Sequence, residues 1–165
     1  MYIGTDPGIN NIAFAHVGKK GEILGGEILI ANQSLSQLDR LILNTAEYQK
    51  IVPKCKYAAI EYTMARSCPS ITSLSLLALC SGILSEIHRE CRGCKVLLVG
   101  PSTWQTKKGK EENADYLKTT LSEKQVDEIY ALADKYPRSI RHNLVDAFGI
   151  AFWLKEVVEG LDATK

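Results

Sequence analysis

The 165-residue chain lacks both a strong net charge and a long uninterrupted apolar run. Its formal net charge is only +1, which excludes a generally basic nucleic-acid coat protein but not a local basic surface. The longest mostly apolar stretch, Ile71 to Ile87, is broken by four serines, a threonine and a glycine. We therefore expect it to be too polar for a membrane span. The first residues already have a strand pattern, so we expect no signal or transit peptide.

The cysteines do not form a pattern typical of a disulfide framework. There are five of them, at Cys55, Cys68, Cys80, Cys91 and Cys94. An odd number without a leader favours an intracellular, reducing compartment, and we expect a cytoplasmic protein. Cys91 and Cys94 form one CxxC pair, but without a second pair or a nearby pair of histidines the zinc signal is weak. A redox motif needs a helix N-terminus, so we expect reduced, structural cysteines.

What is present is the composition of an ordinary globular domain. Hydrophobic residues make up 45% of the chain and charged residues 24%, which are usual values. The length is enough to bury a proper core and predicts a single domain over residues 1–165.

The opening stretch places an acid beside a tight turn. Asp6 follows a short β-rich run, and Pro7 and Gly8 follow Asp6. Proline pre-sets φ at the first central turn position, and glycine can take the positive φ that a type II turn needs next. Asp6 is thus predicted at the carboxyl end of the first strand, either as a metal ligand or catalytic acid or as an ordinary turn aspartate.

The next patterns predict a three-stranded antiparallel meander followed by a helix. Ile12–Val17 and Glu22–Ile30 read as the second and third strands. Ser34 and Gln37 fit a capping box, with Ser34 as the N-cap, and Pro53 ends the predicted helix.

Glu61 is an anomaly in a short apolar strand, Tyr57–Tyr62. Because this strand follows a helix, we expect it to lie parallel to the first strand. A carboxylate there is costly unless it is paired, metal-bound or at the wet end, although an edge glutamate facing solvent is equally acceptable. If the strands are parallel neighbours, Asp6 and Glu61 emerge at the same carboxyl edge, where open α/β sheets bind their ligands.

A loop, a long helix and another strand come next. The loop spans Met64–Ser70, and the helix spans about Ile71–Cys91. The helix is apolar nearly all round, which predicts burial in the core or in a subunit interface. Cys94–Val99 reads as a further parallel strand.

The segment from Gly100 to Lys110 is the basic part of the chain. It contains Trp104 and three lysines, Lys107, Lys108 and Lys110. This composition suits phosphate contacts with an aromatic platform. A solvated loop explains the lysines equally well, and for Trp104 we favour the role of a core anchor.

Three more helices are predicted, and the last carries an acid. The first two are Asn113–Leu121 and a helix that begins at the Ser122 capping box and runs to about Tyr136. The last spans His142–Glu159, with Gly160 as its C′ residue. Asp146 falls in its first turn, where helix capping is the ordinary explanation. The packed sequence that follows it, however, favours a positive group in front of this acid.

Three carboxylates therefore stand out: Asp6, Glu61 and Asp146. Carboxylate oxygens suit Mg²⁺ or Mn²⁺, and two such ions about 4 Å apart can activate a water and stabilise the leaving oxygen in phosphodiester hydrolysis. The order of elements is that of an α/β, RNase H-like fold. Its mixed five-stranded sheet combines a three-stranded antiparallel meander with two parallel strands, flanked by helices.

The sequence resembles the RuvC-type Holliday-junction resolvases over essentially its whole length. The resemblance is carried by four segments in order: Ile3–Gly8, Ala59–Glu61, Val99–Ser102 and Asp146–Ala151. It implies that Asp6, Glu61 and Asp146 are catalytic metal ligands. The family's fourth ligand, usually Asp or His, stands three residues before the last acid, which is Asn143 here. An amide oxygen can bind Mg²⁺ but carries no charge, and the neighbouring His142 could replace it only if the helix start were shifted.

The resemblance also implies the DNA-binding residues. The family has an aromatic residue in the loop after the glutamate, and Met64 stands at about that place, with Arg66 nearby. Lys107 and Lys110 are nearest to the family's lysines in the loop after the fifth strand, and Lys108 shares this basic loop. One of these lysines would steady developing charge during the reaction.

The implied function is a Mg²⁺-dependent endonuclease that acts as a homodimer and resolves four-way DNA junctions by paired symmetric nicks. Two Mg²⁺ ions per site are implied, and Mn²⁺ can replace them. Asp6 would bridge both ions, Glu61 and Asp146 would each complete one site, and Asn143 would assist Asp146. Such an enzyme serves DNA recombination and repair.

Three alternatives remain open at this point. One is a nuclease of the same fold that acts on branched, flapped or RNA-containing substrates, and another is a non-catalytic junction-binding protein. The third, an actin-like or sugar-kinase ATPase, needs two such lobes, and 165 residues are too few. Both a cellular and a viral origin are compatible with the sequence.

Overall fold

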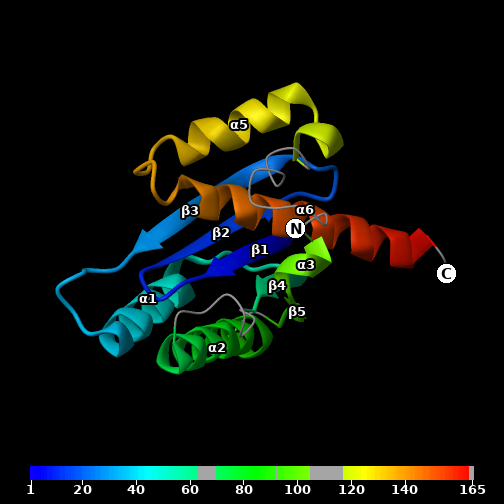
Figure 1. Ribbon diagram of the computed structural model, residues 1–165. Helices are drawn as coiled ribbons and strands as arrows, with labels where there is room; N and C mark the ends of the chain where they lie inside the picture. The colour runs from blue at the N-terminus through cyan, green and yellow to red at the C-terminus, as the bar shows by residue number, and fades with distance from the viewer. Residues whose placement is uncertain (63–69, 92, 105–116, 164–165) are drawn as a thin grey trace.

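A computed structural model describes residues 1–62, 70–91, 93–104 and 117–163. Its centre is a five-stranded sheet with the strand order β3-β2-β1-β4-β5 (Figure 1). The strands are β1 (Tyr2–Pro7), β2 (Asn11–Val17), β3 (Ile23–Ile30), β4 (Tyr57–Glu61) and β5 (Lys95–Val99). The first three pair antiparallel, whereas β4 runs parallel to β1 and β5 runs parallel to β4. This confirms the predicted RNase H-like fold.

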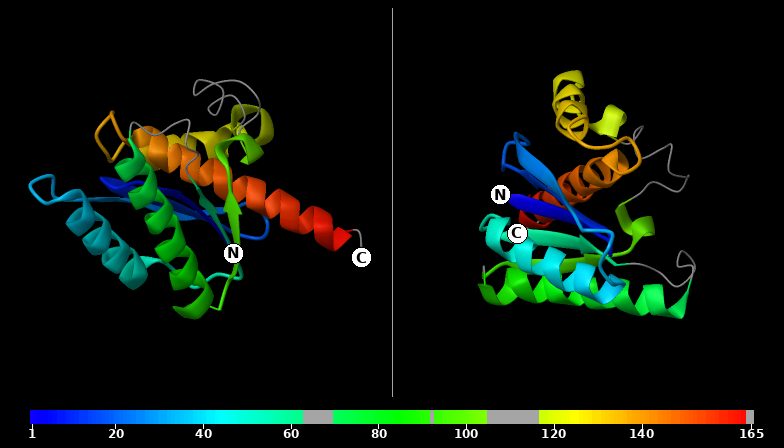
Figure 2. Two further views of the ribbon diagram at one scale, coloured as in Figure 1. Left: turned by 60° about the horizontal axis from the view of Figure 1, so that its bottom comes forward. Right: turned by 90° about the vertical axis from the view of Figure 1, so that its left-hand side faces the viewer.

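Helices cover both faces of the sheet. Their bounds are α1 (Gln37–Ile51), α2 (Ile71–Glu86), the π-helical turn η2 (Ile87–Cys91), α3 (Pro101–Trp104), α5 (Glu123–Ala133) and α6 (Arg141–Ala163). Figure 2 shows α1 and α2 over one face of the sheet and α6, with α5 beyond it, over the other. The α6 helix crosses the central strand β1 and so reaches the carboxyl ends of the strands.

A glycine allows α6 to lie directly on β1. A Cβ atom at Gly4 would overlap the carbonyl oxygen of Ala147 and the backbone nitrogen of Ala151. The two small alanines and the glycine therefore bring helix and strand backbones into contact. Since core positions tolerate little extra volume, this crossing fixes where α6 sits relative to the end of β1.

The opposite face of the sheet has its own core, formed with α1 and α2. Its largest fully buried side chains include Tyr48 from α1, Leu84 from α2, Ile3 from β1 and Ile60 from β4. The Tyr48 hydroxyl is hydrogen-bonded to Thr5 Oγ1 at 2.8 Å and to His88 Nε2 at 2.7 Å. Tyr48 thus links strand β1 to the π-helical turn through the interior.

The predicted turn after Asp6 is wrong in its details. Pro7 is the last residue of β1 and pairs with Ile12, so the turn begins later than the Pro-Gly pair suggested. Gly8 does not have a positive φ. A Cβ at this position would lie 2.5 Å from the carbonyl oxygen of Asn11, so glycine is needed for space rather than for a left-handed conformation.

Three helix boundaries also differ from the predictions. The N-cap of α1 is Ser36, which accepts a hydrogen bond from the backbone of Asp39, and not Ser34. The Ser122 capping box of α5 is confirmed, but this helix already ends at Ala133. Helix α6 starts at Arg141 and continues past the predicted C′ glycine, with the result that the predicted first-turn acid lies in the second turn.

The helix that follows β4 is long and apolar. The described residues contain one helical stretch, Ile71–Glu90, whose length and mean hydropathy of 1.4 would suffice for a membrane span. Its polar interruptions alone therefore do not exclude a span, contrary to our expectation. This is weak support for a membrane segment, because the core helix of a water-soluble domain passes the same test, and α2 packs against α1 and β4.

Candidate active site

Two of the predicted acids lie side by side at the carboxyl edge of the sheet. The parallel pairing of β1 with β4 ends at the pair Thr5 and Ile60, and the next residues of the two strands are Asp6 and Glu61. Both acids are partly buried. The placement follows from strand register, because neighbouring parallel strands in register present matching residues at the same height.

Strand alternation directs both acids toward α6. Thr5 and Ile60 face the core under α1, and Thr5 is bonded there to Tyr48. Since successive side chains of a strand point to opposite faces, Asp6 and Glu61 project from the face that α6 covers.

The α6 crossing brings the third acid to the same edge. Ala147 packs against Gly4, two residues before Asp6, and Asp146 immediately precedes Ala147. Asn143 lies in the first turn of the same helix, three residues earlier. The four predicted ligands thus come from β1, β4 and α6.

Both the side chain and the backbone of Glu61 accept hydrogen bonds. Trp104 Nε1 donates a 2.7 Å hydrogen bond to Glu61 Oε2, and Ser81 Oγ donates to the Glu61 carbonyl oxygen at 3.0 Å. Trp104 is 3% exposed, and its ring lies over Gly149, where a Cβ would approach the ring to 2.7 Å. The predicted anchor role of Trp104 is confirmed. Its bond to Glu61 was missed, although a buried indole N–H generally needs an acceptor.

The surroundings of Glu61 raise its pKa, so they disfavour the charged form of this carboxyl group. Burial raises the pKa to about 7, the Trp104 hydrogen bond lowers it in part, and the negative charge of Asp146 raises it again. A carboxyl group that is desolvated and faces another acid favours protonation. A cation between the two acids would favour the charged form.

Asn143 is tied to the first hairpin. Its Nδ2 donates a short hydrogen bond to Oδ1 of Asn11, at the start of β2. With the amide nitrogen used in this way, the carbonyl oxygen is the atom that Asn143 has left for a cation. Helix α6 starts one residue earlier than predicted, but His142 is exposed on it, whereas Asn143 is partly buried.

The donor set fits divalent cations such as Mg²⁺, because it consists of three carboxylates and an amide, all hard oxygen ligands. The acids are not drawn tightly together. Among the described residues, the three carboxylates do not form a group whose oxygens all lie within 4.8 Å of one another. A site for two ions about 4 Å apart is itself wider than this, and like charges separate when no cation lies between them.

The remaining predicted residues, Met64, Arg66, Lys107, Lys108 and Lys110, lie outside the described residues. The structure does fix where their two segments begin. One follows Tyr62, which is next to Glu61 and 39% exposed, and the other follows Trp104, which is bonded to Glu61. The last described residue before each segment therefore lies beside the same carboxylate.

No protein-family model matches the chain, and no curated protein matches it in sequence. The fold, by contrast, is similar to solved structures of junction resolvases. RuvC of T. thermophilus in complex with a Holliday junction substrate superposes with a TM-score of 0.67 at 18% identity, covering 96% of this chain and 95% of that chain. A second Thermus thermophilus RuvC structure gives a TM-score of 0.58 at 17% identity, covering 96% of both chains.

A viral resolvase is similar as well. The Fowlpox virus resolvase in complex with Holliday junction DNA gives a TM-score of 0.56 at 14% identity, covering 95% of this chain and 99% of that chain. The chain thus has the RNase H-like fold of these resolvases over nearly its whole length. At these identities the similarity establishes the fold and not the activity.

Proposed function

We propose that this protein is a Mg²⁺-dependent endonuclease that resolves four-way DNA junctions by paired symmetric nicks. The proposal is supported by the strand register that puts Asp6 next to Glu61 at the carboxyl edge of an RNase H-like sheet, and by the negative charge of Asp146, which raises the Glu61 pKa. These residues come from three distant parts of the chain, and the raised pKa of Glu61 is what a carboxylate site without its cations should have. The complexes of the similar resolvases with Holliday junctions support the choice of substrate.

In the proposed site, Asp6, Glu61 and Asp146 would hold two Mg²⁺ ions, with Asp6 as the ligand that both ions share. Asn143 contributes its amide oxygen beside Asp146. Bound Mg²⁺, or Mn²⁺ in its place, supplies Lewis acidity for phosphodiester hydrolysis. Trp104 keeps the Glu61 carboxylate aimed at the edge of the sheet by its hydrogen bond.

The substrate would approach over the two segments that begin beside Glu61. Met64 and Arg66 belong to the first and are proposed to contact DNA near the junction centre. Lys107, Lys108 and Lys110 belong to the second, and cationic side chains there would bind phosphates. Lys107 or Lys110 would also stabilise charge that develops on the reacting phosphate.

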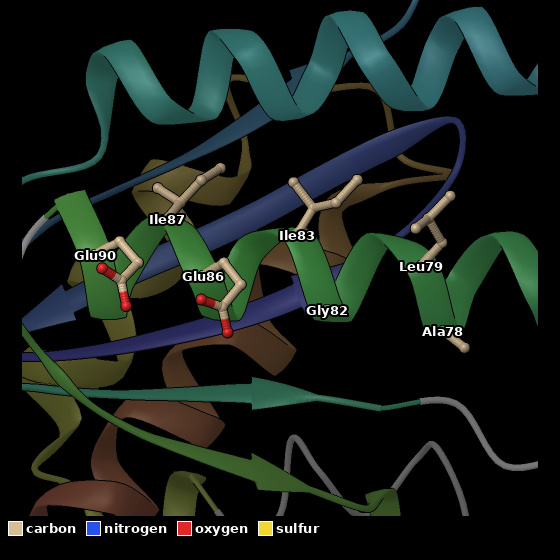
Figure 3. A pocket seen from close by; sticks show the side chains of 7 residues that line it. All are labelled: Ala78, Leu79, Gly82, Ile83, Glu86, Ile87 and Glu90. Carbon is tan, nitrogen blue, oxygen red and sulfur yellow. The ribbon is translucent and has the colours of Figure 1, made fainter.

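We propose that the enzyme works as a homodimer, because two symmetric nicks need two active sites. Helix α2 supports this: Ile71 is 84% exposed and Leu79 is 47% exposed, which leaves apolar surface without cover. A hollow of about 600 Å³ runs along α2 and η2. Figure 3 shows Leu79, Ile83 and Ile87 in a row on the side toward α1, with Glu86 and Glu90 pointing away.

The direct test uses a synthetic four-way junction labelled on each strand in turn. Wild-type protein with Mg²⁺ should give nicks at symmetric positions on two opposing strands and leave a linear duplex of the same sequence intact. Asp6→Asn should bind the junction with similar affinity but cut it at least about 100-fold more slowly, since it removes a charged metal ligand. Absence of paired nicks, or equal cleavage by Asp6→Asn, would contradict the proposal.

The neutral Asn143 keeps a second function under consideration, a junction-binding protein without nuclease activity. Tight junction binding with no cleavage in either Mg²⁺ or Mn²⁺ would favour it. A parallel comparison of junction, flap and RNA–DNA hybrid substrates separates resolution of junctions from a broader nuclease activity of the same fold.

A further inference from the structure

A second group of possible metal ligands lies at the opposite end of the same strands. Cys55 precedes β4, His88 lies in η2, and Cys94 immediately precedes β5. These residues are at the amino ends of the strands, whereas the candidate active site is at their carboxyl ends. Their Sγ and imidazole nitrogen atoms all lie within 4.8 Å of one another. The proposed nuclease activity uses none of them.

The distances suit a tetrahedral site. Zn–S and Zn–N bonds of about 2.3 and 2.1 Å at the tetrahedral angle separate a sulfur from a nitrogen ligand by about 3.6 Å. Cys55 Sγ is 3.6 Å from His88 Nδ1. Cys55 Sγ and Cys94 Sγ are 2.7 Å apart, and they would have to separate by about 1 Å to bind one Zn²⁺ ion.

The imidazole is oriented as a metal ligand requires. His88 is fully buried, and its Nε2 is 2.7 Å from the Tyr48 hydroxyl, while Nδ1 faces the Cys55 sulfur. A zinc-bound Nδ1 needs the tautomer in which Nε2–H donates to Tyr48, and Tyr48 can in turn donate to Thr5 Oγ1. Ligating histidines commonly have their second nitrogen fixed in this manner.

The thiols also differ from a merely buried cysteine. The pKa of Cys94 is lowered to about 6, first by the hydrogen bond with Cys55 and then, against the effect of burial, by His88. The pKa of Cys80, on α2, is raised to about 12, mainly by burial. The thiolate is the form that binds metals, and Cys94 lies in one group with Cys55 and His88, whereas Cys80 does not belong to this group.

We propose that Cys55, His88 and Cys94 bind one Zn²⁺ ion that ties η2 to the segments preceding β4 and β5. Two thiolates and one imidazole are the soft and borderline donors that zinc prefers. The fourth position is open to water or to a further donor. Binding releases the proton of each thiol that is still protonated, and it requires no oxidant or reductant.

The test is the zinc content of untagged protein purified in reducing buffer without chelator. We expect about one zinc per chain by elemental mass spectrometry, and loss of this zinc in Cys55→Ser and in His88→Gln. Two variants should retain it: Cys80→Ala, a matched cysteine control, and Asp6→Asn, which alters only the proposed catalytic site. The two proposals are thus tested separately: zinc content reports on the cysteine and histidine ligands, whereas junction cleavage reports on the carboxylate site that Asp6→Asn alters.

A second measurement does not depend on the folding of variants. Wild-type protein stripped of zinc and refilled with Co²⁺ should show the intense charge-transfer absorption of cobalt–thiolate bonds, which carboxylate ligands do not produce. Wild-type protein without zinc and without this band would overturn the proposal. So would zinc retained by Cys55→Ser, or a Cys55–Cys94 disulfide found by mass spectrometry in the freshly purified chain.

Discussion

Replacing Trp104 with phenylalanine should raise the pKa of Glu61 in the metal-free protein. The indole N–H donates a 2.7 Å hydrogen bond to the Glu61 carboxylate and lowers a pKa that burial and Asp146 raise. Phenylalanine keeps an aromatic ring in the interior but removes the donor. Glu61 then loses an interaction that favours its charged form, so the proton binds more tightly.

The size of the effect follows from the strength of such bonds. A hydrogen bond to a charged group contributes about 1.5–3 kcal/mol, which corresponds to about 1–2 pKa units. The pKa of Glu61, about 7 in the wild type, should therefore rise to about 8 or 9. Because Mg²⁺ needs the carboxylate and half of Glu61 is already protonated at pH 7 in the wild type, the Mg²⁺ concentration for half-maximal cleavage at pH 7 should rise about 5-fold for one unit and about 50-fold for two. The difference should disappear as the pH is raised.

Carboxyl ¹³C NMR of chelator-treated protein measures this pKa directly, with Glu61→Gln identifying the Glu61 signal. The chain offers a matched control in Trp153, its only other tryptophan, which packs in the same core cluster. Trp153→Phe removes a similar volume and should leave the Glu61 pKa within a few tenths of a unit. An unchanged or lowered pKa in Trp104→Phe would refute the reasoning, since a fall would mean that water entering the smaller core outweighs the lost bond.

Three further predictions concern stability and metal affinity. Metal-free protein should lose up to about 3 kcal/mol of unfolding free energy as the pH rises from about 4.5 to 7, because the folded state keeps a proton on Glu61 that the unfolded chain has released. Urea titrations across this pH range should show that Glu61→Gln does not have this loss. An equal loss in Glu61→Gln would assign the pH dependence to other groups. Gly4→Ala should destabilise by about 2 kcal/mol or more, because its Cβ overlaps the α6 backbone. Gly82→Ala, with nothing within 4 Å of its Cβ, serves as the control and should be neutral or stabilising. Asn143→Asp adds a charged ligand and should lower the Mg²⁺ requirement for cleavage severalfold when the assay pH is well above the Glu61 pKa of about 7, so that Glu61 is ionised. An unchanged requirement at that pH would show that residue 143 lies away from the ions.

The sheet and the positions of its acids were predictable because they rest on local pattern and on register. Short β-rich and apolar runs located the strands, and the helix before Tyr57–Tyr62 implied a parallel pairing. That pairing alone places Asp6 beside Glu61. The α6 acid was harder to place in detail, because helix boundaries depend on tertiary contacts as well as on caps.

The errors occurred where several local solutions compete. Ser34 and Ser36 are both followed three residues later by a side chain that suits a capping motif, and the chain uses Ser36. Gly8 looked like a residue with positive φ but is required by the close approach of Asn11. In both cases the residue types correctly indicated a helix start or a turn. The exact conformation depends on contacts that cannot be read from the spacing of residues in the sequence.

The contacts missed entirely are long-range. Trp104 and Glu61 are 43 residues apart, and Cys55 lies 33 residues from His88 and 39 from Cys94. The CxxC pattern includes Cys91 and Cys94 but gives no indication that Cys55 lies near Cys94. The His-x-x-Cys-x-x-Cys spacing that starts at His88 was the available signal, and it becomes persuasive only once the sheet brings Cys55 beside it.

Asn143 has a consequence for how the carboxylate edge is assembled before any cation binds. Glu61, with a pKa of about 7, is only about half ionised at neutral pH. A fourth acid on α6 would raise this pKa further, because each added like charge favours protonation of its neighbours. Asn143 avoids that repulsion, and its amide donates to Asn11, which an ionised aspartate could not do. The first turn of α6 is thereby held against the β1–β2 hairpin. If the proposed site binds Mg²⁺, the neutral Asn143 would attract the ion less than an acid would, but it keeps α6 in place at this edge without adding negative charge.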